Sequence, residues 1–243
     1  PLAVRQAVSD VYGAKIPHYF KYIAEGDENA EPMIEAVEES TGALPSFTVN
    51  IPAGTGDWFG GWDGAGKPDP DRYATPQADA GRMVELIESR RPAIMLCHWP
   101  GMYCNGTKVG FRAFQRVVQS IHARFGEQTR WMKLSEIARY WAARRWTRIS
   151  VGGQPNAAGQ RAPEGSGRSV LVTFDAPLEC PSFTVRIAGD WSRWFWTTGD
   201  GQGQELRKVS SSASLQAGSW WQDADSAVVC VDLQLGRSQL RGT

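Results

Sequence analysis

The chain has 243 residues, enough for one large domain or two modest ones. Its apolar share of 42% and charged share of 21% are typical of a folded globular protein, which excludes bulk intrinsic disorder. Lys plus Arg and Asp plus Glu each number 26, so net charge gives no reason to expect nucleic acid as a partner. No apolar run approaches the roughly 18 residues of a membrane span, and we expect no membrane partner.

Composition divides the chain into three parts. Residues 1–150 carry the helical patterns and all three histidines. Residues 151–168 are rich in Gly, Pro and Ala, which is typical of a linker. Residues 169–243 contain short β-type runs separated by Gly, Ser and Asp. We therefore predict an α/β domain at 1–150, a linker at 151–168 and a small antiparallel β-sandwich at 169–243.

In the first part, predicted helices and strands alternate along the chain. The expected strands cover 45–51, 93–97 and 131–132, and the expected helices cover 31–40, 75–90 and 107–125, with a last helix starting at Ser135. The run AIMLC at 93–97 is continuously apolar, as in a buried parallel strand. Repeated β-α units predict a parallel sheet, open or closed into a partial barrel, with ligands at the carboxyl ends of the strands.

In the last part, we expect strands over 169–174, 182–188, 191–197 and 226–235. Alternation along a strand places Trp194 and Trp196 on one face. If exposed, the two indoles would form a platform for sugar rings, and if buried they are core. Two interpretations also stand for Cys180 and Cys230: a disulfide in an exported protein, or two buried thiols.

His98 is a candidate general acid or base. It follows the apolar run 93–97 directly, so it would lie at the carboxyl end of a buried strand. An imidazole there is half-buried and faces the loops, as proton transfer requires. The alternative is a histidine that only hydrogen-bonds a loop carbonyl.

A Gly-rich loop after the strand 45–51 carries two carboxylates beside two indoles. These are Asp57 and Asp63, with Trp58 and Trp62. Glycines permit tight turns and close approach of a ligand, and carboxylates beside aromatic faces suggest a carbohydrate subsite. The alternative is a turn-rich loop whose indoles cover the core.

Residues 108–148 contain ten Lys and Arg against Glu127 and Glu136. Such a segment could bind nucleic acid or an acidic glycan. Its arginines, however, lie between the apolar positions of predicted amphipathic helices, where solvated faces are expected. Acidic residues elsewhere in the chain would also balance them.

Three short motifs together resemble a known family. Leu96-Cys97-His98 ends a predicted strand, Lys133-Leu134-Ser135-Glu136-Ile137 opens a predicted helix, and Asp57-Trp58 follows a strand. In this order they resemble the C-terminal half of the catalytic domain of the polysaccharide deacetylase (NodB-like) family. The resemblance covers roughly residues 40–149.

The resemblance implies hydrolysis of N-acetyl groups on a glycan. It implies that His98 protonates the leaving amine, that Asp57 orients a catalytic histidine and that Trp58 lines the acetyl pocket. Trp99 and Tyr103, which follow His98, are candidate substrate contacts beside it.

The resemblance also implies a zinc site, which the chain itself does not spell out. The family's Thr-Phe-Asp-Asp and His-x-x-x-His motifs, which hold the metal, do not occur before residue 40, and no cofactor is evident in this chain. The metal half would then come from a missing N-terminal segment or from another chain, unless this relative has lost the site.

The sequence therefore predicts a carbohydrate-active protein with a glycan partner. One alternative is a glycan-binding protein without catalysis that uses exposed Trp residues, and the other is a metal-independent hydrolase that pairs His98 with Asp57 or Asp63. The cellular compartment stays open, with an extracellular or periplasmic location slightly favoured.

Overall fold

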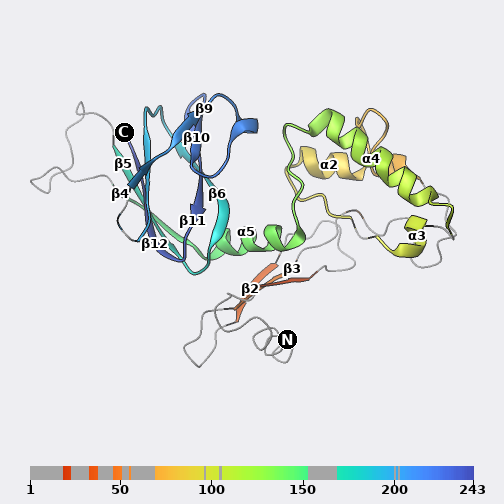
Figure 1. The fold of residues 1–243 in the computed structure, drawn as a ribbon, viewed down its shortest axis with the longest axis horizontal. Coiled ribbons are helices and arrows are strands. Elements are labelled where there is room, and N and C mark those ends of the chain that lie inside the picture. Colours follow the sequence, from red (N-terminus) through yellow and green to blue (C-terminus); the bar gives the residue numbers. More distant parts are fainter. Residues whose placement is uncertain are drawn as a thin grey trace, which may run out of the picture. The chain divides into compact units, whose positions relative to one another are not determined.

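The computed structural model of the chain describes residues 19–22, 33–37, 46–50, 55, 69–95, 97–103, 106–152, 169–199, 201 and 203–243. The chain divides into two compact units (Figure 1). We call the part that runs from Thr48 to Leu134 the helical unit, and the part from Ser135 to Thr243 the β-rich unit. A three-stranded sheet of order β1-β3-β2 contributes residues to both.

The helical unit is built around one apolar cluster. Its elements are η2 (Pro70–Arg72), α2 (Arg82–Glu88), α3 (Trp99–Tyr103) and α4 (Val109–Phe125). Residues of α2 and α4 pack together because Met83 and Val84 meet Val117, Ile121 and Phe125 in the cluster. None of the described helices is long and apolar enough to cross a membrane.

The predicted helix over 75–90 is only half right, because α2 begins at Arg82. Thr75 caps a turn and not the helix: its hydroxyl donates to Asp79 Oδ1 at 2.5 Å and accepts the Asp79 N–H at 3.1 Å. Gly81, with φ at +114°, precedes α2. Met83 and Leu86 of α2 are buried.

The two strands predicted in this unit are wrong for the residues that the structure describes. Residues 93–95 and 97 are extended but pair with no strand, and 131–132 form an irregular segment. Cys97 is exposed, and the Trp131 side chain is 60% exposed. An apolar run therefore lies against helices here and not inside a parallel sheet.

The helix predicted at 31–40 is also wrong. Residues Met33–Val37 form strand β2, which lies beside β3 (Ser46–Asn50), and β1 (Tyr19–Tyr22) flanks β3 on its other side. Pairing with a central strand overrides the helical propensity of Met, Glu and Ala in this segment. The strand predicted at 45–51 is confirmed as β3.

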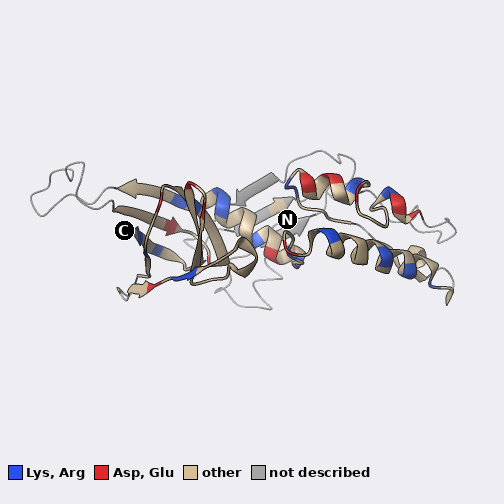
Figure 2. Cartoon of the chain, turned by 90° about the horizontal axis from the view of Figure 1, so that it is seen from above, with Lys and Arg blue, Asp and Glu red and all other residues tan. Residues whose placement is uncertain are grey.

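Two of the three arginines of α4 form ion pairs within the helical unit. Arg116 forms an ion pair with Asp71, and Arg124 donates to Glu88 Oε1 at 2.8 Å. Figure 2 shows both charge signs over the helices of this unit. These pairs support the interpretation of the basic segment as a solvated, internally balanced face and not as a nucleic-acid surface.

The described part of the β-rich unit contains one α-helix, the short 3-10 helix η4 (Ser212–Ser214) and two sheets. The helix is α5 (Leu134–Trp146). The five-stranded sheet has the order β4-β5-β12-β7-β8 and the four-stranded sheet the order β6-β11-β10-β9. The strands are β4 (Arg148–Gly152), β5 (Val170–Ala176), β6 (Cys180–Ala188), β7 (Trp194–Thr197), β8 (Gly203–Glu205), β9 (Arg207–Val209), β10 (Ser219–Asp223), β11 (Ser226–Leu233) and β12 (Gly236–Gly242).

Pairing in these sheets is antiparallel except between β9 and β10, which run parallel. The expected mixture of helices and strands is therefore confirmed, and these two sheets are antiparallel and mixed, respectively. Phe174 of β5 joins the two sheets, with its ring centroid 6.3 Å from Phe183 of β6 and 5.5 Å from Trp196 of β7.

The unit boundary lies earlier than the predicted end of the first domain at residue 150. Helix α5 belongs with the β-rich unit, where the Tyr140 ring lies 5.7 Å from that of Phe183. Strand β4 pairs with β5 over 148–152, so Val151 and Gly152 are part of the sheet and not of the linker. The rest of the predicted linker, 153–168, lies outside the described residues.

Cys180 and Cys230 are buried thiols, so the alternative of a disulfide between them is wrong. Burial raises the pKa of the Cys180 thiol to about 12, with the nearby Arg139 charge opposing the rise. In the unfolded chain this thiol ionises near pH 8.5, at about its reference pKa. The folded state therefore keeps a proton that the unfolded state loses.

We expect the free energy of unfolding to fall as the pH rises from about 8.5 toward 12, by up to about 1 kcal/mol per pH unit from Cys180. Below about pH 8.5 the contribution of Cys180 to the free energy of unfolding is fully present. Urea unfolding at pH 8 and pH 10.5 measures it in the native chain and in Cys180→Val. If the free energy of unfolding falls by the same amount between pH 8 and pH 10.5 in Cys180→Val as in the native chain, the assignment to Cys180 is wrong.

Candidate ligand-binding surface

His98 lies at the junction between the extended segment 93–97 and helix α3. Its carbonyl accepts the Met102 N–H at 3.2 Å, so the residue begins the first turn of the helix. The side chain is half-buried, as predicted. The predicted position after a buried strand is wrong, because the preceding residues are extended without a strand partner among the described residues.

Three aromatic rings beside His98 form a ladder, which we call the aromatic platform: Trp99, Tyr103 and Phe111. The Trp99 and Tyr103 centroids are 5.0 Å apart with planes at 21°. Tyr103 and Phe111 follow at 6.5 Å and 6°. The residues are 74%, 39% and 37% exposed, respectively. The rings are therefore close to parallel and accessible to solvent.

Helix geometry and one loop hydrogen bond hold the platform together. Trp99 and Tyr103 are four residues apart on α3, which places them on one face. Lys108 donates its N–H to the Tyr103 carbonyl at 2.8 Å, and its left-handed backbone (φ +56°) turns the chain into α4. Phe111, in the first turn of α4, then lies against Tyr103.

Exposed cationic side chains flank the platform. Lys108 and Arg112 are exposed, and Arg112 Nη1 donates to the Thr107 carbonyl at 2.8 Å. This bond fixes the guanidinium near the start of α4. Aromatic faces bordered by hydrogen-bond donors can hold a flat, hydroxyl-rich ring: its C–H groups face the π-system, and the donors contact its oxygens.

Trp194 and Trp196 do not belong to a ligand surface. Both point into the core of the β-rich unit, where they are 0% and 8% exposed. The predicted alternation is confirmed, because Phe195 lies on the opposite face and is only half-buried. Their role as a sugar-stacking platform is wrong because packing against Trp191 and Phe174 leaves no room for a ligand.

The carboxylates and indoles of the Gly-rich loop, Asp57, Trp58, Trp62 and Asp63, lie outside the described residues. Of the predicted site residues, the described part of the chain brings together His98, Trp99 and Tyr103.

The zinc site implied by the family resemblance finds no ligand set among the described residues. No three side chains of His, Cys, Asp or Glu converge there as a metal site would require.

Phe111 is the platform residue that the sequence does not reveal. Its spacing from Phe114 and Val118 fits the apolar stripe of an amphipathic helix, so the pattern places it in the core. In the structure α4 starts at Val109, and its first turn extends past the apolar cluster. The exposed neighbours Lys108 and Arg112 are the signal that this turn faces solvent.

Comparison with known proteins gives no relative: no family model, no curated protein and no solved structure matches the chain. The function is therefore argued from the residues themselves.

Proposed function

We propose that the protein binds a carbohydrate across the aromatic platform. The observation that carries the proposal is the nearly parallel, exposed ladder of Trp99, Tyr103 and Phe111. A contiguous exposed apolar patch costs solubility, and such patches typically mark an interaction site. Stacked rings cover part of one another's faces, so the face open to a sugar ring is that of Trp99, the most exposed ring of the ladder.

The proposal includes a glycan as the partner, an extracellular or periplasmic location, and a small β-sandwich as the architecture of the C-terminal strands. Contact of Phe174 with Phe183 across the two sheets supports that architecture. The half-buried His98 would donate to or accept from a sugar hydroxyl, since it precedes Trp99 directly.

Replacing Trp99 with alanine is expected to lower the affinity for an oligosaccharide about tenfold, which corresponds to about 1.4 kcal/mol, because the most exposed ring of the ladder is lost. Titration calorimetry with N-acetylglucosamine and cellulose oligomers measures the affinity. Since the indole is largely in solvent, the unfolding midpoint should stay unchanged.

Trp146→Ala is the matched control, because Trp146 is also an exposed indole but lies on α5 in the other unit. Its affinity should equal that of the native chain. If the Trp99 and Trp146 variants bind equally well, or if no oligomer binds the native chain, carbohydrate binding at the platform is wrong.

The second candidate is a polysaccharide deacetylase-like hydrolase. It is supported by His98 standing next to the platform, where an acetylated sugar would lie. It also requires parallel β-α units, and the described residues 93–95 and 97 do not form the strand that it needs. Release of acetate from N-acetylglucosamine oligomers separates this candidate from binding alone.

A third candidate, metal-independent hydrolysis by His98 with Asp57 or Asp63, depends on carboxylates outside the described residues. Acetate release that persists with a chelator present and stops in Asp57→Asn or Asp63→Asn would favour it over the deacetylase-like candidate.

A further inference from the structure

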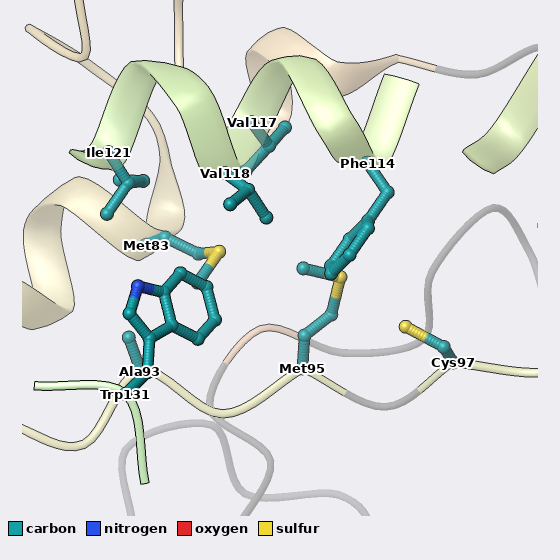
Figure 3. Close-up of a pocket in the computed structure, with 9 residues that line it drawn as sticks. All are labelled: Met83, Ala93, Met95, Cys97, Phe114, Val117, Val118, Ile121 and Trp131. Carbon is teal, nitrogen blue, oxygen red and sulfur yellow. The ribbon is translucent and has the colours of Figure 1, made fainter. Parts of the chain in front are cut away.

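The helical unit contains an apolar cavity of about 210 Å³ that is separate from the rings of the platform (Figure 3). Its lining combines the helices α2 and α4, the extended segment 93–97 and the irregular segment at 131: Met83, Ala93, Met95, Cys97, Phe114, Val117, Val118, Ile121 and Trp131. None of these nine side chains carries a charge at neutral pH.

The sequence pattern explains why these side chains converge. Ala93, Met95 and Cys97 alternate along an extended segment, so they face the same side. Phe114, Val117, Val118 and Ile121 follow the helical spacing on one face of α4. An apolar strand-like segment thus lies opposite an apolar helix face, and the space between them is left unfilled.

The cavity is open to solvent at one side. Val117 and Ile121 are buried at its floor, whereas Cys97 and Trp131 are exposed at its edge. In Figure 3 the Trp131 indole stands across from Val118 and Met83, and Cys97 stands at the end beyond Phe114. A ligand could therefore enter without unfolding the unit.

Size and shape determine the class of ligand. A cavity of about 150 Å³ holds benzene in another protein, so 210 Å³ accommodates a slightly larger molecule. From Phe114 to Ile121 the lining extends over seven residues of helix, about 10 Å. A charge-free space of about 210 Å³ that follows about 10 Å of helix fits a linear hydrocarbon chain and is too small for a helix or a folded partner.

We propose that this cavity binds an alkyl chain of about six to eight carbon atoms, held by contacts with methionine sulfurs and aromatic rings. Met83 and Met95 are unbranched and adapt to the shape of a chain. The inference does not depend on carbohydrate binding at the platform. The alkyl chain can belong to a small free ligand or be one part of a larger molecule.

The test uses simple linear alcohols, from 1-butanol to 1-decanol, as probes. An alkyl chain bound in the cavity covers the Cys97 thiol, so it slows modification of that thiol by a disulfide reagent. Cys180 and Cys230 are buried and react slowly, and the Cys104→Ser background removes the remaining thiol. We expect saturable protection, with an affinity about tenfold above that of 1-butanol for 1-hexanol and about a hundredfold above it for 1-octanol.

Val118→Phe fills the space and should weaken protection about tenfold or more, and Ala93→Leu should do the same from the opposite wall. Val151→Phe is the matched control, because Val151 is exposed on β4 in the other unit. Circular dichroism establishes that each variant is folded.

Three results would overturn the proposal. One is that no alcohol protects Cys97 in the native chain, which would mean that the chain itself closes the cavity. Another is equal protection in the filled variants and in the control. A third is an affinity that rises steadily through 1-decanol without a limit at the cavity's length, which would indicate adsorption to a surface. Failure of oligosaccharide binding at Trp99 leaves all three measurements unaffected.

Discussion

Replacing Trp194 with alanine is expected to lower the free energy of unfolding of the β-rich unit by about 3–5 kcal/mol. The indole is fully buried and lies 5.0 Å from the Trp191 ring, centroid to centroid. Gly242 of the neighbouring strand β12 packs against it so closely that a Cβ there would come within 2.7 Å of the ring. Truncation leaves a cavity that the paired strands cannot close.

The Trp194→Phe variant separates the contribution of ring packing to stability from that of the buried indole N–H. Trp194 Nε1 is buried and has no hydrogen-bond partner among the described residues. Phenylalanine keeps most of the apolar contact and removes that donor, so its cost should stay below about 2 kcal/mol. Urea unfolding followed by near-UV circular dichroism measures both variants. Equal losses for Phe and Ala would mean that packing of the ring does not carry the stability.

Replacing Gly81 with alanine is expected to destabilise the helical unit by about 3 kcal/mol or more. Its φ of +114° lies in a region that is essentially restricted to glycine. A Cβ at this position would also lie 2.5 Å from the Tyr73 carbonyl carbon and oxygen, which are backbone atoms that no side-chain rotation can move aside. The backbone strain and the steric clash both act at the start of α2, where Met83 donates its N–H to the same Tyr73 carbonyl at 3.0 Å.

Two control glycines separate backbone strain from steric contact. Gly218 has φ at +81° but open space around its Cα, so Gly218→Ala should cost only the strain, about 1–2 kcal/mol. Gly152 in β4 has neither feature, and its alanine variant should be nearly neutral or slightly stabilising. If the Gly81 and Gly218 variants lose equal stability in urea unfolding, the contact with Tyr73 is not the cause.

Strands rich in apolar and β-branched residues could be predicted from the sequence. The runs at 169–174, 182–188 and 226–235 became β5, β6 and β11 because their apolar positions are numerous enough to reveal a buried face. Strand β12 could not be found in this way. Its inward positions are Ser238, Leu240 and Gly242, of which only one is apolar. Its place in the sheet is set by fitting a glycine against Trp194.

Elements that depend on distant partners could not be predicted. The run at 93–97 has the composition of a buried strand, but its neighbours in space are the side chains of α4 and not another strand. Residues 33–37 have a helical composition and are held extended beside β3. In both cases tertiary contacts decide between conformations that the local sequence allows.

The candidate site was predictable where its residues are adjacent in the chain. His98, Trp99 and Tyr103 lie within one short motif, so a single local structure brings them together. Phe111 joins them only through the turn at Lys108, which the sequence pattern does not encode as a motif. The two tryptophans of β7 were ambiguous because an alternating strand looks the same whether its aromatic face is covered or open.

The antiparallel pairing of β4 with β5 means that a segment of the chain starts and ends at one place. Gly152 lies opposite Leu171, so the two points of the sheet between which residues 153–168 run in the sequence are direct neighbours. The hydrogen bonds between these strands hold the two sides together independently of the peptide chain that links them. The polypeptide can therefore be opened, lengthened or interrupted by an inserted domain between 153 and 168 while α5 and β4 keep their places beside the remaining strands.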